Sequence, residues 1–429
     1  MAIFLSSEIV EIKNPSKTFV WHDVFNQIKD KTNGNIVKLN LVKSTREKLY
    51  FHVVSLHGVN LFLDEPYVGA GFKLAPTNDK ITCLIIPTGI GALYGGYAGD
   101  ANPIAKLFSK TNKYLLTHPN VVNGAVLSDI PENTIYLEGY LLDQFLLGGI
   151  SIIPNNKNKI GVIFDKGIDS KRLDYEINVL NALQTFYGCN IECYTITEKP
   201  ILVKPEINEH GFSTGEILNI DCLIDKALEL KQDGITAIAI CVSMPDPELN
   251  KKYIFGEGID PIGGIESLIS HAVSSVTGLV SAHAPVLTDT PDVDYKNISP
   301  LSASEYIALT FLPSVISGLR YSPTVIKSSV DKGLTNNNIG QIIVPYNGFG
   351  SAGVLFLASM LNEKIFLVKE NQTCLNVDPK DIRINFNIVE KYLDLIPEKV
   401  LHESPINLNV LRRPVKKISP SQSALFAKY

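Results

Sequence analysis

The chain has 429 residues, of which 45% are hydrophobic and 19% are charged, and its formal net charge is −5 at pH 7. This is the composition of an ordinary globular protein, and the length suits about two or three domains. The acidic balance, with no dense Lys/Arg run before residue 412, argues against nucleic acid as a partner. No apolar run approaches the ~20 residues that span a bilayer, so we also expect no membrane partner.

Cysteine usage and the N-terminus predict the compartment. The six cysteines form no CxxC pair, which argues against a disulfide framework and favours a reducing environment. The N-terminal residues MAIFLSSEIVEIK lack the basic region and long apolar core of a signal peptide. We therefore expect a cytoplasmic protein, for which a homo-oligomer is an open alternative to a monomer.

Residues 1–75 predict a small α+β module. Apolar runs at 36–42 and 49–54 are typical of strands around a charged turn, and residues 21–31 have helical spacing. Residues 376–429 predict one helix and an irregular tail.

Residues 76–375 predict an α/β core with a mainly parallel sheet built from Rossmann-like βαβ units. We expect two lobes that meet near residues 155–160. Residues 202–218 read as a long polar loop that could serve as a lid. Residues 305–319 have a helical pattern that Pro313 should kink or split. The expected strands lie near 82–86, 114–117, 160–164, 191–196, 236–242 and 342–345.

Two glycine-rich loops after buried strands are the strongest functional signal. Five glycines fall within residues 89–99, and a second loop occupies 348–353; a proline precedes each loop. Backbone N–H groups of such loops can hold an anionic or polar ligand, whereas a plain surface turn is the alternative. We expect both loops to meet at one pocket. The candidate ligand-binding residues are Thr88, Gly89, Gly91, Gly95, Gly96, Asn120, Asn123, Glu138, Asp260, Gly263, Gly264, Asn347, Gly348, Gly350 and Ser351.

The spacing of the first loop excludes two common nucleotide motifs. No Gly-Lys-Ser/Thr follows it, so it is not a Walker A loop. Tyr94 stands where the third glycine of a dinucleotide fingerprint would fall, so we expect no nicotinamide or flavin cofactor.

Three histidines in polar, glycine-rich surroundings are the candidate acid/base groups. His118, His271 and His283 follow or occupy predicted strands and helices, and Asp100 lies in the first glycine loop. A histidine titrates near pH 7 and suits general acid/base catalysis, although many histidines only satisfy structural hydrogen bonds. We expect His118 to lie beside Asp100, which would favour the charged imidazole, and to contribute to turnover rather than to folding.

A metal site remains a second hypothesis. His271, His283 and a carboxylate would suit a divalent first-row metal, although the spacing matches no established motif. A serine nucleophile is less favoured, because no GxSxG sequence occurs.

The motifs PTGIGALYGGYAGDANP, THPNVVNGA, GGIESLISH and SAHAP, with VPYNGFGSAGVL, together resemble a family of uncharacterised proteins. That family carries a domain-of-unknown-function label and occurs in bacteria, cyanobacteria and plant plastids. The resemblance covers residues 80–372 and implies no activity. From the residues themselves we expect an enzyme that acts by general acid/base chemistry on a small polar, carboxylate-bearing metabolite, as an isomerase, lyase, cyclase or hydrolase. The alternatives are a non-catalytic small-molecule sensor and a metal-dependent hydrolase.

Overall fold

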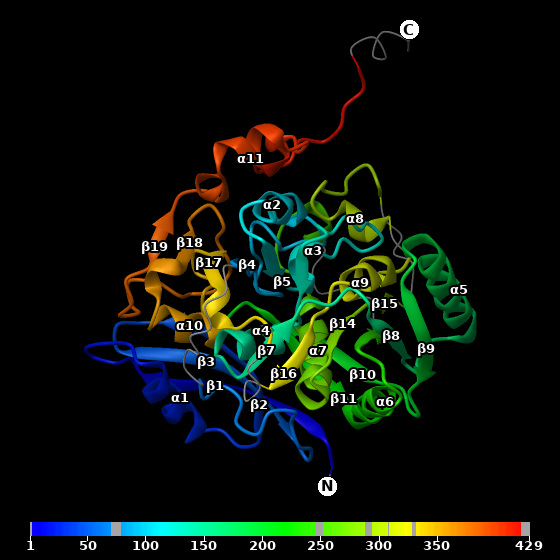
Figure 1. Ribbon diagram of the computed structural model, residues 1–429, viewed down its shortest axis with the longest axis horizontal. Helices are drawn as coiled ribbons and strands as arrows, with labels where there is room; N and C mark the ends of the chain where they lie inside the picture. Colours follow the sequence, from blue (N-terminus) through cyan, green and yellow to red (C-terminus); the bar gives the residue numbers. More distant parts are fainter. Residues whose placement is uncertain are drawn as a thin grey trace.

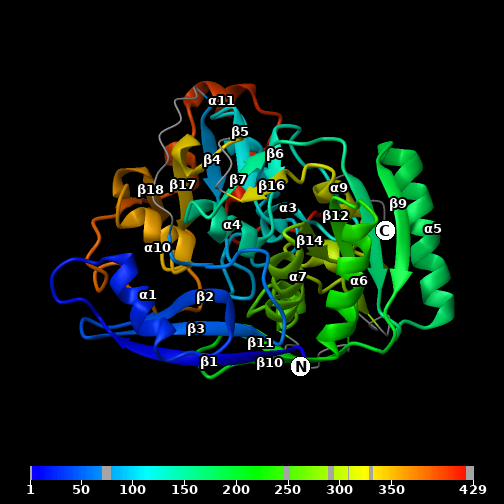
Figure 2. The same cartoon turned by 60° about the horizontal axis from the view of Figure 1, so that its bottom comes forward.

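The computed structural model describes residues 2–69, 79–244, 252–287, 294–307, 309–327 and 332–421. Within these ranges the chain is an α/β protein with two parallel sheets and an antiparallel N-terminal sheet (Figures 1 and 2). Buried apolar side chains from all three sheets form one continuous core that runs from Val10 to Leu411.

The N-terminal module is an antiparallel sheet covered by one helix. The strands pair in the order β1-β3-β2, with bounds Phe4–Lys13 (β1), Asn35–Ser44 (β2) and Lys48–His57 (β3). Helix α1 (Trp21–Lys29) buries Trp21, Val24, Phe25 and Ile28, a spacing that places these side chains on one face. The sequence predicted β2, β3 and α1 but missed β1, in which only Val10 and Ile12 are fully buried.

The first parallel sheet carries both glycine loops. Its order is β19-β18-β17-β4-β5-β6, so β4 and β17, which precede the two loops, are neighbours. Parallel neighbours end at the same edge, which brings the loops together. The strand bounds are Ile81–Leu84 (β4), Tyr114–Thr117 (β5), Thr134–Tyr136 (β6), Ile339–Pro345 (β17), Ile365–Val368 (β18) and Asn387–Val389 (β19). The associated helices are α2 (Asn102–Phe108), α3 (Pro119–Val122), α4 (Gly139–Leu146) and α10 (Ala352–Ala358).

The second parallel sheet has the order β14-β12-β8-β9. The chain enters it at β8, directly after β7, and so crosses between the sheets at residues 154–158. The strand bounds are Ile150–Ile153 (β7), Lys159–Phe164 (β8), Asn190–Ile196 (β9), Ala237–Cys241 (β12) and Val280–His283 (β14). The helices are α5 (Ser170–Tyr187), α6 (Ile220–Gln232), α7 (Gly263–Thr277) and α9 (Leu312–Leu319).

Two segments differ from the expected structure or refine it. Residues 202–218, predicted as a loop, form an antiparallel hairpin of β10 (Leu202–Ile207) and β11 (Ser213–Leu218). The alternation of exposed and partly buried residues in β10 is typical of a strand, and the prediction gave too much weight to its polar content.

The helical pattern at 305–319 divides into α8 (Ala303–Tyr306) and α9, and Pro313 occupies the first turn of α9, where proline is favoured.

The remaining elements are short. Strand β13 (Ser243–Met244) pairs with β15 (Val286–Leu287), and β16 (Thr324–Lys327) pairs with β7. After β19, the C-terminal segment runs through α11 (Glu398–Glu403) and lies beside α2 at the top of Figure 1. The 3-10 turns are η2 (Tyr253–Phe255), η3 (Asn336–Asn338), η4 (Asn362–Lys364), η5 (Tyr392–Leu395) and η6 (Leu408–Leu411).

Candidate functional site

A cavity of about 200 Å³ lies where the three sheets meet. Strand β2 of the N-terminal sheet contacts both α7 and α10, so the N-terminal module forms one wall of this cavity. The loops after β4, β5 and β17 form a second wall, and α7 and the start of α4 form a third. The cavity is therefore assembled from segments that are remote in the sequence.

Both glycine loops line this cavity, as the sequence predicted. From the first loop Thr88, Gly96 and Ala98 reach it, and from the second Gly348 and Gly350. The other predicted ligand contacts that lie on the cavity wall are Asn120, Asn123, Glu138, Asp260 and Ser351. Those that lie off the wall are Gly89, Gly91, Gly95, Gly263, Gly264 and Asn347.

Several loop amides already donate to protein carboxylates. Gly95 N donates to Asp100 Oδ1 at 2.7 Å, and Ala98 N donates to Glu305 Oε1 at 2.8 Å. In the second loop region, Gly353 N donates to Asp143 Oδ1 at 3.0 Å. These three amides, of which Ala98 N alone belongs to a residue on the cavity wall, are thus engaged by carboxylates of the chain itself, a pairing that sequence spacing cannot reveal.

The glycine pair at the start of α7 has a packing role. A Cβ on Gly264 would lie 2.0 Å from the carbonyl oxygen of Ser213, so the helix start and strand β11 approach too closely for any side chain. Gly264 N donates to Ser213 Oγ at 3.0 Å. This contact places α7, and with it His271, against the cavity.

His271 is in direct contact with Glu138. The histidine projects from α7, and its Nδ1 contacts Glu138 Oε1, while Glu138 Oε2 accepts from Tyr140 N at 2.9 Å as the N-cap of α4. The carboxylate is 1% exposed, and Gly139 leaves room for the ring, since a Cβ there would lie 2.7 Å from His271 Cε1. Glu138 thus fixes the ring orientation, and Nε2 stays available to a ligand.

His283 forms a second, looser pair with Glu266. It ends strand β14, its side chain is 1% exposed, and its Nδ1 lies 3.6 Å from Glu266 Oε1. Neither ring nitrogen has a hydrogen-bond partner among the described residues. Both histidines line the cavity, so the structure brings together two of the residues that the sequence singled out.

His118 lines the same cavity but faces different partners from those expected. Its Nε2 accepts a hydrogen bond from Ile86 N at 3.1 Å, which ties the loop after β5 to the end of β4. Burial, helped by the charge of His271, lowers the pKa of His118 to about 3. The imidazole is therefore neutral, and the expectation that a carboxylate would favour its charged form is wrong.

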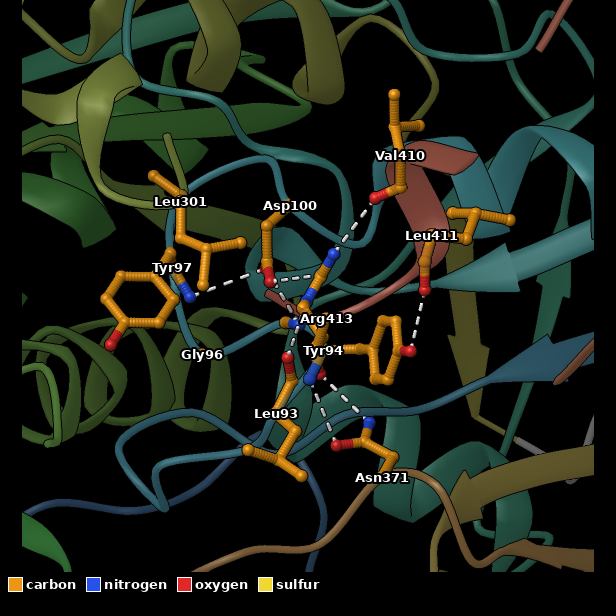
Figure 3. Close-up of polar contacts among 12 residues, drawn as sticks. Leu93, Tyr94, Gly96, Tyr97, Asp100, Leu301, Asn371, Val410, Leu411 and Arg413 are labelled. Atoms are coloured by element: carbon orange, nitrogen blue, oxygen red, sulfur yellow. Dashed lines mark hydrogen bonds and ion pairs between the residues drawn. The ribbon is translucent and has the colours of Figure 1, made fainter. Parts of the chain in front are cut away.

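Asp100, expected beside His118, lies off the cavity and pairs with the C-terminal segment (Figure 3). Its Oδ2 is 2.9 Å from Arg413 Nη2, and the guanidinium stacks 4.2 Å above the Tyr94 ring centroid. Tyr94 OH in turn donates to the Leu411 carbonyl at 2.7 Å. Burial raises the pKa of Asp100 to about 6, although Arg413 opposes this shift. Asp100 therefore clamps the glycine loop to the C-terminal segment.

The predicted asparagines hold backbone in place. Asn120 Nδ2 donates to the carbonyls of Ile86 and Gly95, and Asn123 exchanges hydrogen bonds with Tyr136 OH. Asn347 Nδ2 donates to the Leu375 carbonyl at 2.7 Å. These side chains thus form hydrogen bonds within the protein. They contribute to the site by holding the neighbouring backbone in place.

Lys38 is the main residue that sequence reasoning missed. It lies in β2 on the cavity wall with Asn40, two positions further on the same face. Its Nζ donates to Ser267 Oγ at 3.1 Å, and burial lowers its pKa to about 8 against the opposing charge of Glu138. The signal in the sequence was a lysine and an asparagine at alternate positions of the otherwise apolar run 36–42.

Acidic side chains gather at the cavity near α8. Asp260 and Glu305 both line it, and burial raises the pKa of Asp260 to about 7 and that of Glu305 to about 8. Glu266 raises both pKa values further through its charge. These groups share one region of the cavity, and sequence spacing alone did not group them.

A metal site is not formed by the predicted ligands. In the ranges that the structure describes, no three His, Cys, Asp or Glu side chains are arranged to hold a metal ion. His271 and His283 instead each face a separate glutamate.

The fold and this cavity define an α/β protein with a buried polar site. The family described as "Protein of unknown function (DUF3326)" matches residues 81–412, and the chain belongs to this family. The match extends beyond the resemblance at residues 80–372 into the C-terminal segment. It ends at the residue before Arg413. The N-terminal module with Lys38 precedes it.

An uncharacterized lipoprotein of Synechococcus sp. is 34% identical to this chain over 318 residues, which cover 73% of this chain and 88% of that protein. No solved structure matches the chain. In the described part of the chain, no helix is both long enough and apolar enough to cross a bilayer.

Proposed function

We propose that this protein is an enzyme that acts by general acid/base chemistry on a small polar, carboxylate-bearing metabolite. The observation that carries the proposal is the pairing of two histidines with two glutamates on one cavity, His271 with Glu138 and His283 with Glu266. Each pair joins two different elements, so neither is a by-product of the geometry of one helix.

The first pair has the arrangement of an oriented base. With Nδ1–H directed to Glu138, His271 Nε2 is the nitrogen that accepts a proton from a substrate. Glu138 then stabilises the imidazolium that forms, and its second oxygen is already engaged by the α4 backbone. The second pair, His283–Glu266, supplies a group that returns or receives a proton elsewhere in the cavity. Isomerase, lyase, cyclase and hydrolase reactions all use such transfers.

Lys38 is the proposed contact for the substrate carboxylate. The Lys38 ammonium is the lysine or arginine charge that the described cavity wall offers. Its pKa of about 8 leaves it largely charged at neutral pH. One of its donors binds Ser267, and the others are free to bind a carboxylate.

Deuterium uptake tests this function while the substrate is still unidentified. The purified protein, incubated in D2O with a small-molecule extract of the native cells, should consume a metabolite or label it with deuterium in a mass spectrum. Heat-denatured protein should not do so, and added chelator should leave the change intact, because the proposed chemistry uses histidines rather than a metal. A metabolite that binds tightly with neither labelling nor conversion would contradict the enzyme and support a ligand sensor.

We also propose that the protein acts in the cytoplasm. All six cysteines are free thiols, and Cys83 and Cys241 are buried in strands, which suits a reducing compartment. The name of the Synechococcus relative favours a membrane-anchored location instead. Fractionation of the native cells should recover the protein with the cytoplasmic contents, and recovery in washed membranes would contradict this proposal.

A further inference from the structure

We propose that the cavity contains a subsite for a protonated amine, formed by Asp260, Glu266 and Glu305 with His283 beside them, so that the ligand is an amino acid-like zwitterion. This inference rests on the proposed function, because it assigns the second charged group of the same ligand. Its test measures binding alone, so it can fail or succeed independently of turnover.

Among the residues that the structure describes, no lysine or arginine pairs with the carboxylates of this subsite. Glu305 Oε1 accepts from Ala98 N and from Tyr253 OH, both at 2.8 Å, and Asp260 Oδ1 accepts from Ile262 N at 3.0 Å. Among the ion pairs of the described residues, Glu266 meets only His283, and neither Asp260 nor Glu305 has a partner. The two carboxyl groups are therefore held in place by neutral donors, and no lysine or arginine of the described residues pairs with them to balance the charge that each gains on deprotonation.

His283 is the independent sign of a missing ligand. Its side chain is 1% exposed, it lies on the cavity wall, and neither ring nitrogen has a hydrogen-bond partner in the described structure. A buried polar group without a partner is costly, because it has given up its hydrogen bonds to water, and a bound ligand is one way to satisfy it. Its Nδ1 faces Glu266 at 3.6 Å, which directs the ring toward the acidic subsite.

An organic ammonium suits this subsite better than a metal ion. An ammonium group carries three N–H donors and one positive charge, so it can bind several carboxylates without a fixed coordination geometry. A metal ion would need three well-placed ligands, an arrangement that the described residues do not form. Without a ligand, the raised pKa values, about 7 for Asp260 and about 8 for Glu305, leave both groups partly protonated at pH 7. Binding of an ammonium would therefore release protons.

Lys38 supplies the complementary charge for the other half of the ligand. It lies in β2 beside Ser267 and Glu138, whereas Asp260 precedes α7 and Glu305 lies in α8. A molecule with one carboxylate and one ammonium would satisfy both regions, whereas a dicarboxylate would satisfy only Lys38.

Titration calorimetry with a graded set of probes tests the subsite. The probes are unbranched amino acids from glycine to 6-aminohexanoate, with the matched dicarboxylates and diols. At least one amino acid should bind at least tenfold more tightly than its matched dicarboxylate and diol. Measured in buffers of different ionisation enthalpy at pH 7, its binding should release protons to the buffer.

Three variants separate the two ends of the ligand. Glu305→Gln keeps the acceptors for Ala98 N and Tyr253 OH, and because the carboxyl is largely protonated in the free protein, the variant should fold. It should weaken amino acid binding at least tenfold and reduce proton release. Asp260→Asn should do the same, and Lys38→Met should weaken dicarboxylates as well. Equal binding of the amino acid and its dicarboxylate, unchanged binding in both acid variants, or displacement of the probe by Mg²⁺, Mn²⁺ or Zn²⁺ would overturn the proposal.

Discussion

Replacement of His271 by asparagine should reduce the rate of the catalysed reaction by about 10²–10⁴-fold, the usual contribution of a general acid/base group. The asparagine amide can still donate to Glu138, but it cannot accept and return a proton. The melting temperature should change little, because the asparagine amide can still donate to Glu138 and Glu138 keeps its bonds to the α4 backbone. Rate and melting curve are measured on the same preparation, with the substrate that the deuterium experiment identifies.

A histidine–glutamate pair on the surface offers a matched control for this variant. His402 lies on the surface helix α11, 3.5 Å from Glu398, and its side chain is 78% exposed. His402→Asn should leave both the rate and its pH profile unchanged. If His271→Asn retained the wild-type rate, or lost rate only in proportion to unfolding, His271 would be a structural residue.

Replacement of Arg413 by glutamine should destabilise the protein by about 3–5 kcal/mol, the cost of breaking a buried ion pair by removing one partner. Asp100 is 5% exposed on its side chain, and Arg413 is its only cationic contact within the described residues. The guanidinium also stacks on Tyr94 and donates to the carbonyls of Leu93 and Val410 (Figure 3). Denaturant unfolding of wild type and variant measures the difference.

The effect of Arg413→Gln should grow with pH. In the folded wild type the pKa of Asp100 is about 6, above its ordinary value of 3.8. The free energy of unfolding that Asp100 contributes therefore falls as the pH rises from about 3.8 to about 6, and it is constant above pH 6. Without Arg413 the folded-state pKa rises further, and the decline continues above pH 6. The variant should therefore lose more stability at pH 8 than at pH 4.

A double variant isolates the buried charge from the other contacts of Arg413. Asn at position 100 can still accept from Gly95 N and Tyr97 N but carries no charge. Asp100→Asn with Arg413→Gln should be more stable than Arg413→Gln alone, and its stability should lack the added pH dependence. Equal stability of the two would show that the pair contributes through packing rather than charge.

Local sequence patterns determined the α/β class and most strands. Strand Tyr114–Thr117 has the expected bounds, and the other five predicted strands differ by a few residues at their ends. The patterns also determined the placement of both glycine loops after buried strands, since parallel strands deliver their following loops to one edge. Periodicity and turn residues are short-range properties, so a single sequence carries them completely.

Tertiary structure alone decided which side chains became partners. Asp100 met Arg413, which lies 313 positions later in the chain, and Lys38 reached the cavity because the N-terminal sheet packs on α7 and α10. The glycine-loop amides, read from sequence as free donors, met the carboxylates of Glu305 and Asp143. Such pairings depend on packing between distant elements, which sets distance and burial together. Burial then decides which groups are charged, because desolvation lowers the pKa of His118 and outweighs the opposing backbone hydrogen bonds at Asp260.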